Sequence, residues 1–212
     1  MSSITEQTSN EDRMTRYRTD VAARRTRNIV QGLHHHAYIA RNLEETRHFY
    51  EDILGLPLIG TWVERHNPVT NQRDNYVHAF FELADGSCLA FFQFKDQQYN
   101  DQTAISSFKQ NNPFAHHIAL EVRGFEALEE MKMRLRSGDI PFVETDHGYC
   151  QSIYLYDPNG MQVEFTTQVP RTDEMFATVA PTAHDVLADW LSQECLPSNN
   201  EFRSKEGWKP GT

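Results

Sequence analysis

Beyond residue 32, hydrophobic and polar positions follow a strand, helix, strand, strand, strand order. Asn42 is a candidate N-cap with Glu45 three residues later, and apolar residues then recur at helical spacing, which predicts a helix. Short runs of apolar or alternating residues on either side predict strands. Asp85 and Gly86 predict a hairpin turn between the last two strands. The predicted strands are residues 33–40, 58–64, 76–83 and 89–94.

The same order of elements returns in the second half of the chain. The polar segment 95–113 separates the two copies, and we interpret it as a linker or an active-site flap. A helix is predicted over 125–136, ended by Ser137 and Gly138. The predicted strands of this copy are residues 114–122, 142–144, 150–156 and 161–167.

Two local sequence matches support an internal duplication. His35-His36-Ala37-Tyr38 recurs as residues 117–120, and residues 83–91 recur as 156–165 with one extra residue. Internal repeats of this kind decide the fold class. The sequence therefore predicts an α+β fold made of two βαβββ modules. Their predicted bounds are 33–94 for module one and 114–168 for module two.

Segments of a different character flank this duplicated domain, 32–168. Residues 1–31 are polar, and acids interrupt their arginines, so we expect a mobile, partly helical arm and not a targeting peptide. Residues 169–212 are expected to form a C-terminal helical extension. Its helix, predicted over 182–191, has one apolar face that should be buried.

Composition and charge exclude several classes of protein. The 212 residues carry a formal net charge of -10, which argues against a duplex nucleic-acid binder. No apolar run approaches the roughly 18 residues of a membrane helix. Three cysteines without a CxxC pair suit a reducing compartment. We expect a cytoplasmic protein that binds neither nucleic acid nor membranes.

Candidate chemistry lies at matching places in the two copies. Strand alternation puts His35 on one face with Ala37, and His117 on one face with Ala119, so a small neighbour leaves room beside each imidazole. Glu164 lies in an apolar strand, where a carboxylate is costly to bury unless it is paired or metal-bound. Two histidines and a carboxylate are the composition of a facial triad that leaves open positions on a divalent metal. The alternative is a pair of core histidines and a salt-bridged glutamate.

Three runs of the sequence, "HHHAYIARNLEETRHFYEDILGLPL", "HHIALEV" and "IYLYDPNGMQVEF", resemble the vicinal oxygen chelate superfamily. That superfamily groups glyoxalase I, fosfomycin-resistance proteins, bleomycin-binding proteins and type I extradiol dioxygenases. The resemblance covers residues 32–168 and implies paired modules whose curved mixed sheet surrounds a metal cleft. It implies metal ligands at His35, His117 and Glu164. If a register is off by one, the alternatives are His34, His36 and His116.

The resemblance also bears on the branch of the superfamily. Glyoxalase I has a further carboxylate ligand in its first module, and that position is Ala90 here. This favours the three-ligand branches, which are Fe(II) extradiol dioxygenases and Mn(II) fosfomycin-type enzymes. Extradiol dioxygenases have a tyrosine ten residues before the carboxylate ligand, where Tyr154 stands, although a core aromatic is an equal alternative. They also place a histidine near His147, but with a different spacing.

Other side chains near the predicted site have simpler interpretations. His78 lies in the middle of a strand of module one, and it either lines the cleft or is packed. Cys150 has no partner that could activate it as a nucleophile, so we interpret it as structural. The phenylalanines of module one are mainly core, and some of them favour an aromatic substrate.

The prediction for function is a metal-dependent enzyme, most plausibly an extradiol-type dioxygenase of a small catechol-like aromatic. Fe(II) is the expected metal, with Tyr154 orienting the substrate and His147 moving a proton. One alternative is a lyase, isomerase or transferase that uses Mn(II), Zn(II) or Ni(II) as a Lewis acid. A second alternative is a metal-free small-molecule binding protein. We expect a homodimer.

Overall fold

The structure is a computed structural model that describes residues 2–67, 70, 73–108, 116–170, 172–192 and 209–210. The chain divides into two compact units. The larger unit begins at Gly32 and contains both predicted modules except residues 145–151 and 168. The smaller unit contains the N-terminal helix, residues 145–151 and the helices that follow residue 168. Among the described residues, no helix is both long enough and apolar enough to cross a membrane.

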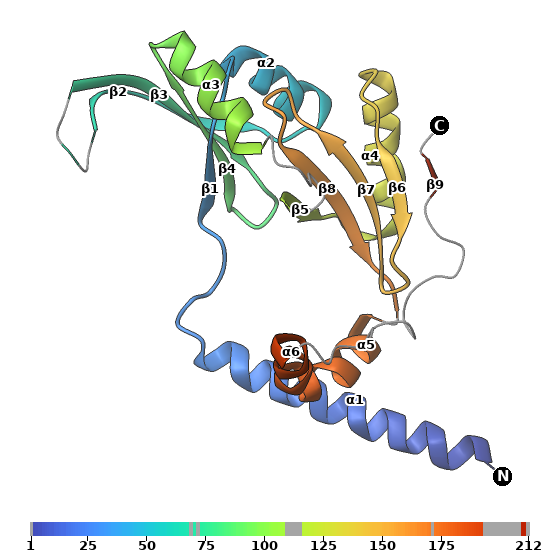
Figure 1. The fold of residues 1–212 in the computed structure, drawn as a ribbon. Helices are drawn as coiled ribbons and strands as arrows, with labels where there is room; N and C mark the ends of the chain where they lie inside the picture. The colour runs from blue at the N-terminus through green and yellow to red at the C-terminus, as the bar shows by residue number, and fades with distance from the viewer. Residues whose placement is uncertain are drawn as a thin grey trace. The chain divides into compact units, whose positions relative to one another are not determined.

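Module one forms a four-stranded mixed sheet in the order β1-β4-β3-β2, with β1 parallel to β4 and the other pairs antiparallel (Figure 1). All four strands and the helix overlap the predicted ranges. Gly86 has a φ of 85°, a backbone conformation that glycine adopts without strain, so it makes the predicted turn between β3 and β4. The elements are β1 His35–Ile39, α2 Leu43–Arg47, the π-helical continuation His48–Ile53, β2 Leu58–His66, β3 Arg73–Glu82 and β4 Cys88–Phe94.

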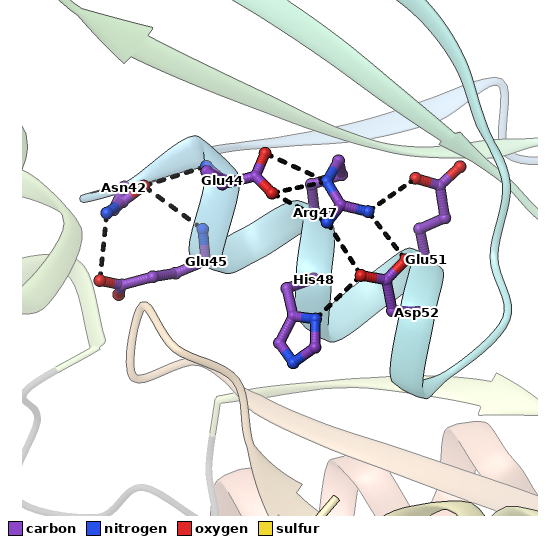
Figure 2. Close-up of polar contacts among 7 residues, drawn as sticks. All are labelled: Asn42, Glu44, Glu45, Arg47, His48, Glu51 and Asp52. Atoms are coloured by element: carbon purple, nitrogen blue, oxygen red, sulfur yellow. Dashed lines mark hydrogen bonds and ion pairs between the residues drawn. The ribbon is translucent and has the colours of Figure 1, made fainter.

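The helix of module one begins where the sequence predicts it. The Asn42 side chain accepts hydrogen bonds from the backbone N–H of Glu44 and Glu45, and its amide donates to the Glu45 carboxylate (Figure 2). Arg47 then binds the carboxylates of Glu44, Glu51 and Asp52. Because Arg47 lies where α2 becomes π-helical, these ion pairs join both parts of the helix.

Module two forms a second mixed sheet in the order β5-β8-β7-β6-β9, with β5 parallel to β8. Residues 114–115 of the predicted first strand lie outside the described residues, and the other elements overlap their predictions. The two βαβββ modules confirm the predicted α+β fold. The elements are β5 His117–Glu121, α4 Gly124–Ser137, β6 Val143–Asp146, β7 Cys150–Tyr156, β8 Gln162–Gln168 and β9 Lys209–Pro210.

The turn between β7 and β8 joins the two modules. Asp157 is buried in this turn and accepts a hydrogen bond of 3.1 Å from the hydroxyl of Tyr50 in module one. Asn159 accepts from the backbone N–H of Arg41 at 2.9 Å and donates to the Thr46 hydroxyl at 3.2 Å. Apolar residues of both modules also belong to one core cluster. These contacts fix module two against the helix of module one.

Two polar segments are more ordered than the sequence predicts. Residues 95–113 were expected to be a linker or flap, but α3, Gln97–Phe108, occupies most of their described part. Asp96 accepts from the N–H of Tyr99 at the start of α3, a capping signal that polarity obscured. Residues 1–31 were expected to be a mobile, partly helical arm, and α1, which runs from Ser2 to Arg27, makes most of this segment helical. This helix contains neither Gly nor Pro and ends in three arginines, which suit the negative end of a helix dipole.

The smaller unit pairs α1 with α5, Thr172–Val179, a helix that the sequence did not predict. Arg18 binds Asp173 at 3.1 Å between them. The predicted C-terminal helix is present as α6, Ala183–Ser192. Its apolar face was expected to be buried, but among the described residues it is exposed at Val186, Leu187, Trp190 and Leu191. The rest of the predicted extension, including Cys195, lies outside the described residues apart from β9.

Candidate metal centre

Two of the three predicted ligands meet on module two. His117 begins the edge strand β5, and Glu164 lies on its neighbour β8. The parallel register places Glu164 beside Ala119, so the His117 imidazole reaches the carboxylate over a small side chain. Nε2 of His117 lies 2.9 Å from Oε2 of Glu164. The Glu164 side chain is only 7% exposed and that of His117 is 27% exposed, so the pair is open on the imidazole side.

This geometry fits a divalent metal as well as a hydrogen bond. Nitrogen and oxygen ligands lie about 2.0–2.2 Å from a divalent metal, so two ligands at a right angle are roughly 3 Å apart. The 2.9 Å between Nε2 of His117 and Oε2 of Glu164 has that length. Imidazole together with carboxylate suits Fe(II), Mn(II), Zn(II) and similar ions. The imidazole and the buried carboxylate also give a hydrogen bond that holds the pair without metal.

Tyr154 lies beside this pair. It comes from β7, is nearly buried, and its ring centroid is 5.8 Å from that of His117 in an edge-on arrangement. Of the predicted catalytic residues, Tyr154 is therefore brought to the pair. Gln162 was missed by the sequence analysis. It lies directly opposite His117 in the register, and its buried Oε1 has no hydrogen-bond partner among the described residues. Its place two residues before Glu164, on the same strand face, was the available signal.

The third predicted ligand, His35, lies in module one. Its backbone register confirms the duplication, because Ala37 pairs with Ala90 as Ala119 pairs with Glu164. Ala90 therefore occupies the position in module one that Glu164 holds in module two. Among the described residues, no three His, Cys, Asp or Glu side chains lie close enough together to hold a metal. Within a single chain, His117 and Glu164 thus lie together, but His35 does not join them as a third ligand.

The sheet face that carries His35 is aromatic. We call the side chains on it the aromatic wall: Trp62, Tyr76, His78, Phe80, Phe92 and Phe94. His78 is at its centre, stacked on Phe92 with 3.7 Å between ring centroids. Burial lowers the pKa of His78 from 6.5 to about 4, with a smaller contribution from the charge of His35, so the imidazole is neutral at pH 7.

The alternative ligand positions face elsewhere. His36 packs edge-on against Tyr38 with 4.3 Å between ring centroids, away from the aromatic wall. Nδ1 of His34 lies 2.8 Å from Nδ1 of His35. His116 is exposed one residue before β5. The structure thus puts His35 on the aromatic-wall side and His117 against Glu164.

His147 and Cys150 lie at the turn between β6 and β7. The backbone N–H of His147 donates to the carbonyl of Cys150 at 3.0 Å, and its ring lies 6.0 Å from that of Tyr149. This turn belongs to the smaller unit, so the expected role of His147 as a proton shuttle stays a prediction. The Cys150 side chain is half-buried.

Comparisons with known proteins agree with this architecture. Residues 32–165 match the family model described as Glyoxalase/Bleomycin resistance protein/Dioxygenase superfamily. The glyoxylase/bleomycin resistance protein/dioxygenase domain from Frankia sp. EAN1pec is 14% identical, with a TM-score of 0.50 over 65% of this chain and 98% of that one. The genomically encoded fosfomycin resistance protein FosX from Listeria monocytogenes is 19% identical, with a TM-score of 0.48 over 68% and 99%. No curated protein matches the sequence.

Proposed function

Because the chain belongs to the glyoxalase/bleomycin resistance protein/dioxygenase superfamily, we propose that it is a metal-dependent enzyme, specifically an extradiol-type dioxygenase of small catechol-like aromatics. One observation carries the proposal. His117 and the buried Glu164 lie at the separation of two neighbouring metal ligands, with the Tyr154 ring beside them. Metal-ion catalysis on an aromatic diol needs this combination of ligands and a positioned donor.

Each side chain has a distinct task in this proposal. His117 and Glu164 hold one divalent metal, for which Fe(II) is the best choice. When bound, Fe(II) supplies sites for two adjacent substrate oxygens and for O₂, and the electron transfer between them. The Tyr154 phenol donates a hydrogen bond to one substrate oxygen and fixes its orientation. His147 accepts or returns the proton of that substrate hydroxyl.

The third ligand in this proposal is His35 of a second copy of the chain. The basis is that one chain joins only two ligands, while the duplicated fold gives His35 the matching strand position in module one. Both β1 and β5 are edge strands of their sheets, so another molecule can approach either of them. A two-fold dimer would then contain two equal sites, each completed by the partner. The free, buried thiol of Cys88 suits the cytoplasmic location that we propose.

The decisive experiment is oxygen uptake by the anaerobically reconstituted protein. The full chain is loaded with Fe(II) and given a panel of catechols in an oxygen electrode. We expect about one O₂ consumed per ring opened. Tyr154→Phe should lower kcat by about 10²-fold, because it removes a positioned hydrogen-bond donor. Glu126→Gln, which changes an exposed carboxylate on α4, is the matched control and should retain full activity.

The opposite outcome moves the protein to another branch. If Fe(II) gives no oxygen uptake while Mn(II), Zn(II) or Ni(II) supports turnover under nitrogen, the site acts as a Lewis acid in a lyase, isomerase or transferase. If the purified chain binds none of these metals, it is a binding protein for small molecules. Metal content measured on the same sample separates these two outcomes.

A further inference from the structure

His78 has a polar atom without a partner. Its Nε2 is buried, and it makes no hydrogen bond among the described residues. Buried polar atoms are nearly always hydrogen bonded, so an exception calls for an explanation. His78 lies on β3, an inner strand of its sheet.

The surroundings of His78 are rings. Phe92 stacks on one side at 3.7 Å, and Phe80 lies 4.2 Å away between ring centroids. Trp62 and His35 follow at 6.5 and 6.2 Å. The first two are half-buried, whereas Trp62 and His35 are exposed side chains of the edge strands β2 and β1. Because these two side chains are exposed, the aromatic wall is open to solvent on their side, and a flat molecule can lie against it there without opening the core.

We propose that His78 binds a hydroxyl group of a flat aromatic ligand whose ring lies against the aromatic wall. This inference rests on the proposed function, since it names the residue and the surface that would select a catechol-like substrate. It adds a specificity-determining residue in module one to the ligands and the tyrosine of module two. His35 lies 6.2 Å from His78 between ring centroids, so in the proposed dimer it would bring the aromatic wall of its own chain to the metal held by the other copy.

A hydroxyl group matches His78 better than an anion does. A neutral imidazole presents either a donor or an acceptor at Nε2, depending on its tautomer, and a hydroxyl group can serve both. A hydroxyl group needs no charged partner, and the three aromatic rings nearest His78 apart from His35, those of Phe92, Phe80 and Trp62, carry no charge. Aromatic rings favour stacked or edge-on contacts at the distances seen within the wall.

The test compares catechol with toluene, which has a similar ring but no hydroxyl group. Dissociation constants are measured by equilibrium dialysis on the metal-free full chain, so that chelation plays no part. His78→Phe keeps a ring to stack on Phe92 but removes both nitrogens. We expect the Kd of catechol to rise about tenfold, as for loss of one hydrogen bond, and that of toluene to change less than about twofold. His78→Gln should recover most of the affinity for catechol.

His66→Gln is the matched control, because His66 is an exposed residue of the same β2–β3 hairpin. Its Kd for catechol should equal that of the wild type. In ¹⁵N-labelled wild-type protein, catechol but not toluene should shift the Nε2 resonance of His78, a measurement that no folding defect can affect. The inference is overturned if catechol does not bind, if His78→Phe weakens both ligands equally, or if Nε2 does not respond.

These results are independent of the proposed reaction. Loss of oxygen uptake together with His78-dependent binding of catechol would refute the dioxygenase and keep the binding site. Oxygen uptake from catechols without any effect of His78→Phe on their Kd would refute the binding site and keep the enzyme.

Discussion

The two modules share a strand order and a register, yet the functional faces of their sheets differ. In module two, the strand next to the edge carries Glu164, which binds His117 and lies near Tyr154. In module one the equivalent position is Ala90, and an aromatic wall surrounds His35. The two copies therefore share a backbone arrangement but carry different functional side chains.

This difference shows how the two copies in a duplicated fold can have different functions. A buried carboxylate is costly without a partner, so each copy retains one only where a histidine or a metal stabilises it. With alanine in its place, the face of module one has room for flat apolar groups. We infer that module two supplies charge and ligands, and that module one supplies one ligand and the substrate surface.

The largest expected effect is on metal binding. Glu164→Gln and His117→Ala should each lower metal affinity by more than about 100-fold, which exceeds the loss caused by outer-shell partners alone. Metal content by elemental analysis, on protein dialysed against dilute Fe(II) or Mn(II), measures this. His36→Ala and His116→Ala should retain full content, since neither side chain faces the pair. Full metal content in Glu164→Gln would show that the metal does not need Glu164. The difference between Glu164 in module two and Ala90 in module one would then have another function.

The second prediction tests whether module two of one chain and module one of its partner form the site together in a dimer. His35→Ala and Glu164→Gln homodimers should both be inactive. When the two variants are mixed and allowed to exchange, half of the dimers are mixed, and each has one intact site. Activity should therefore rise from the background to about a quarter of the wild-type value. A mixture that stays inactive while exchange is confirmed by mass spectrometry would place the whole site within one chain.

Most of the fold followed from the sequence because its signals are local. The alternation of apolar residues, the Asn42 cap and the turn glycines act within a few residues, and the structure confirms the elements that they predict. Likewise, the repeat matched Ala90 with Glu164 before the register was known, and the two residues hold equivalent places in the registers although the turn of module two is one residue longer.

What the sequence did not predict depends on long-range contacts or on weak patterns. The helices α3 and α5 have polar or mixed compositions, so their apolar periodicity was too weak to identify them, and for the same reason the arm that contains α1 was expected to be only partly helical. The place of His35 relative to His117 and Glu164 depends on how the modules pack, and strand alternation carries no information about that. Nor could the sequence show that Nε2 of His78 and Oε1 of Gln162 are buried without a hydrogen-bond partner in the described part of the chain.

The third effect compares the two equivalent hairpin turns. Asn159 is buried and bonds Arg41, Thr46 and Asp157, whereas the bonds of Asp85 in module one stay at the neighbouring Ser87. Asn159→Ala should lower the free energy of unfolding by about 2–4 kcal/mol, because several buried groups lose their partners.

Asp85→Ala is the matched control for that turn, since it removes a comparable side chain at an exposed site. It should cost about 0.5–1 kcal/mol. Urea denaturation of both variants gives the comparison. Equal losses would mean that the turn of module two does not hold the modules together.

The smallest effect is on the pH dependence of stability. His78 of module one should make the free energy of unfolding depend on pH. Burial lowers the pKa of this imidazole from 6.5 to about 4 in the folded chain. Between those values the unfolded chain binds more protons than the folded chain, so stability rises with pH and falls as pH drops from 6.5 towards 4. Because much of the side chain is still exposed, we expect only about 1 kcal/mol after allowance for solvent screening. Urea denaturation of the metal-free protein at pH 7 and pH 4.5 measures this loss.

The loss should be smaller by that amount in His78→Phe and unchanged in His66→Gln. If His78→Phe loses as much stability as the wild type between these pH values, the imidazole of His78 is solvated in the folded protein. Burial in the aromatic wall then does not lower its pKa.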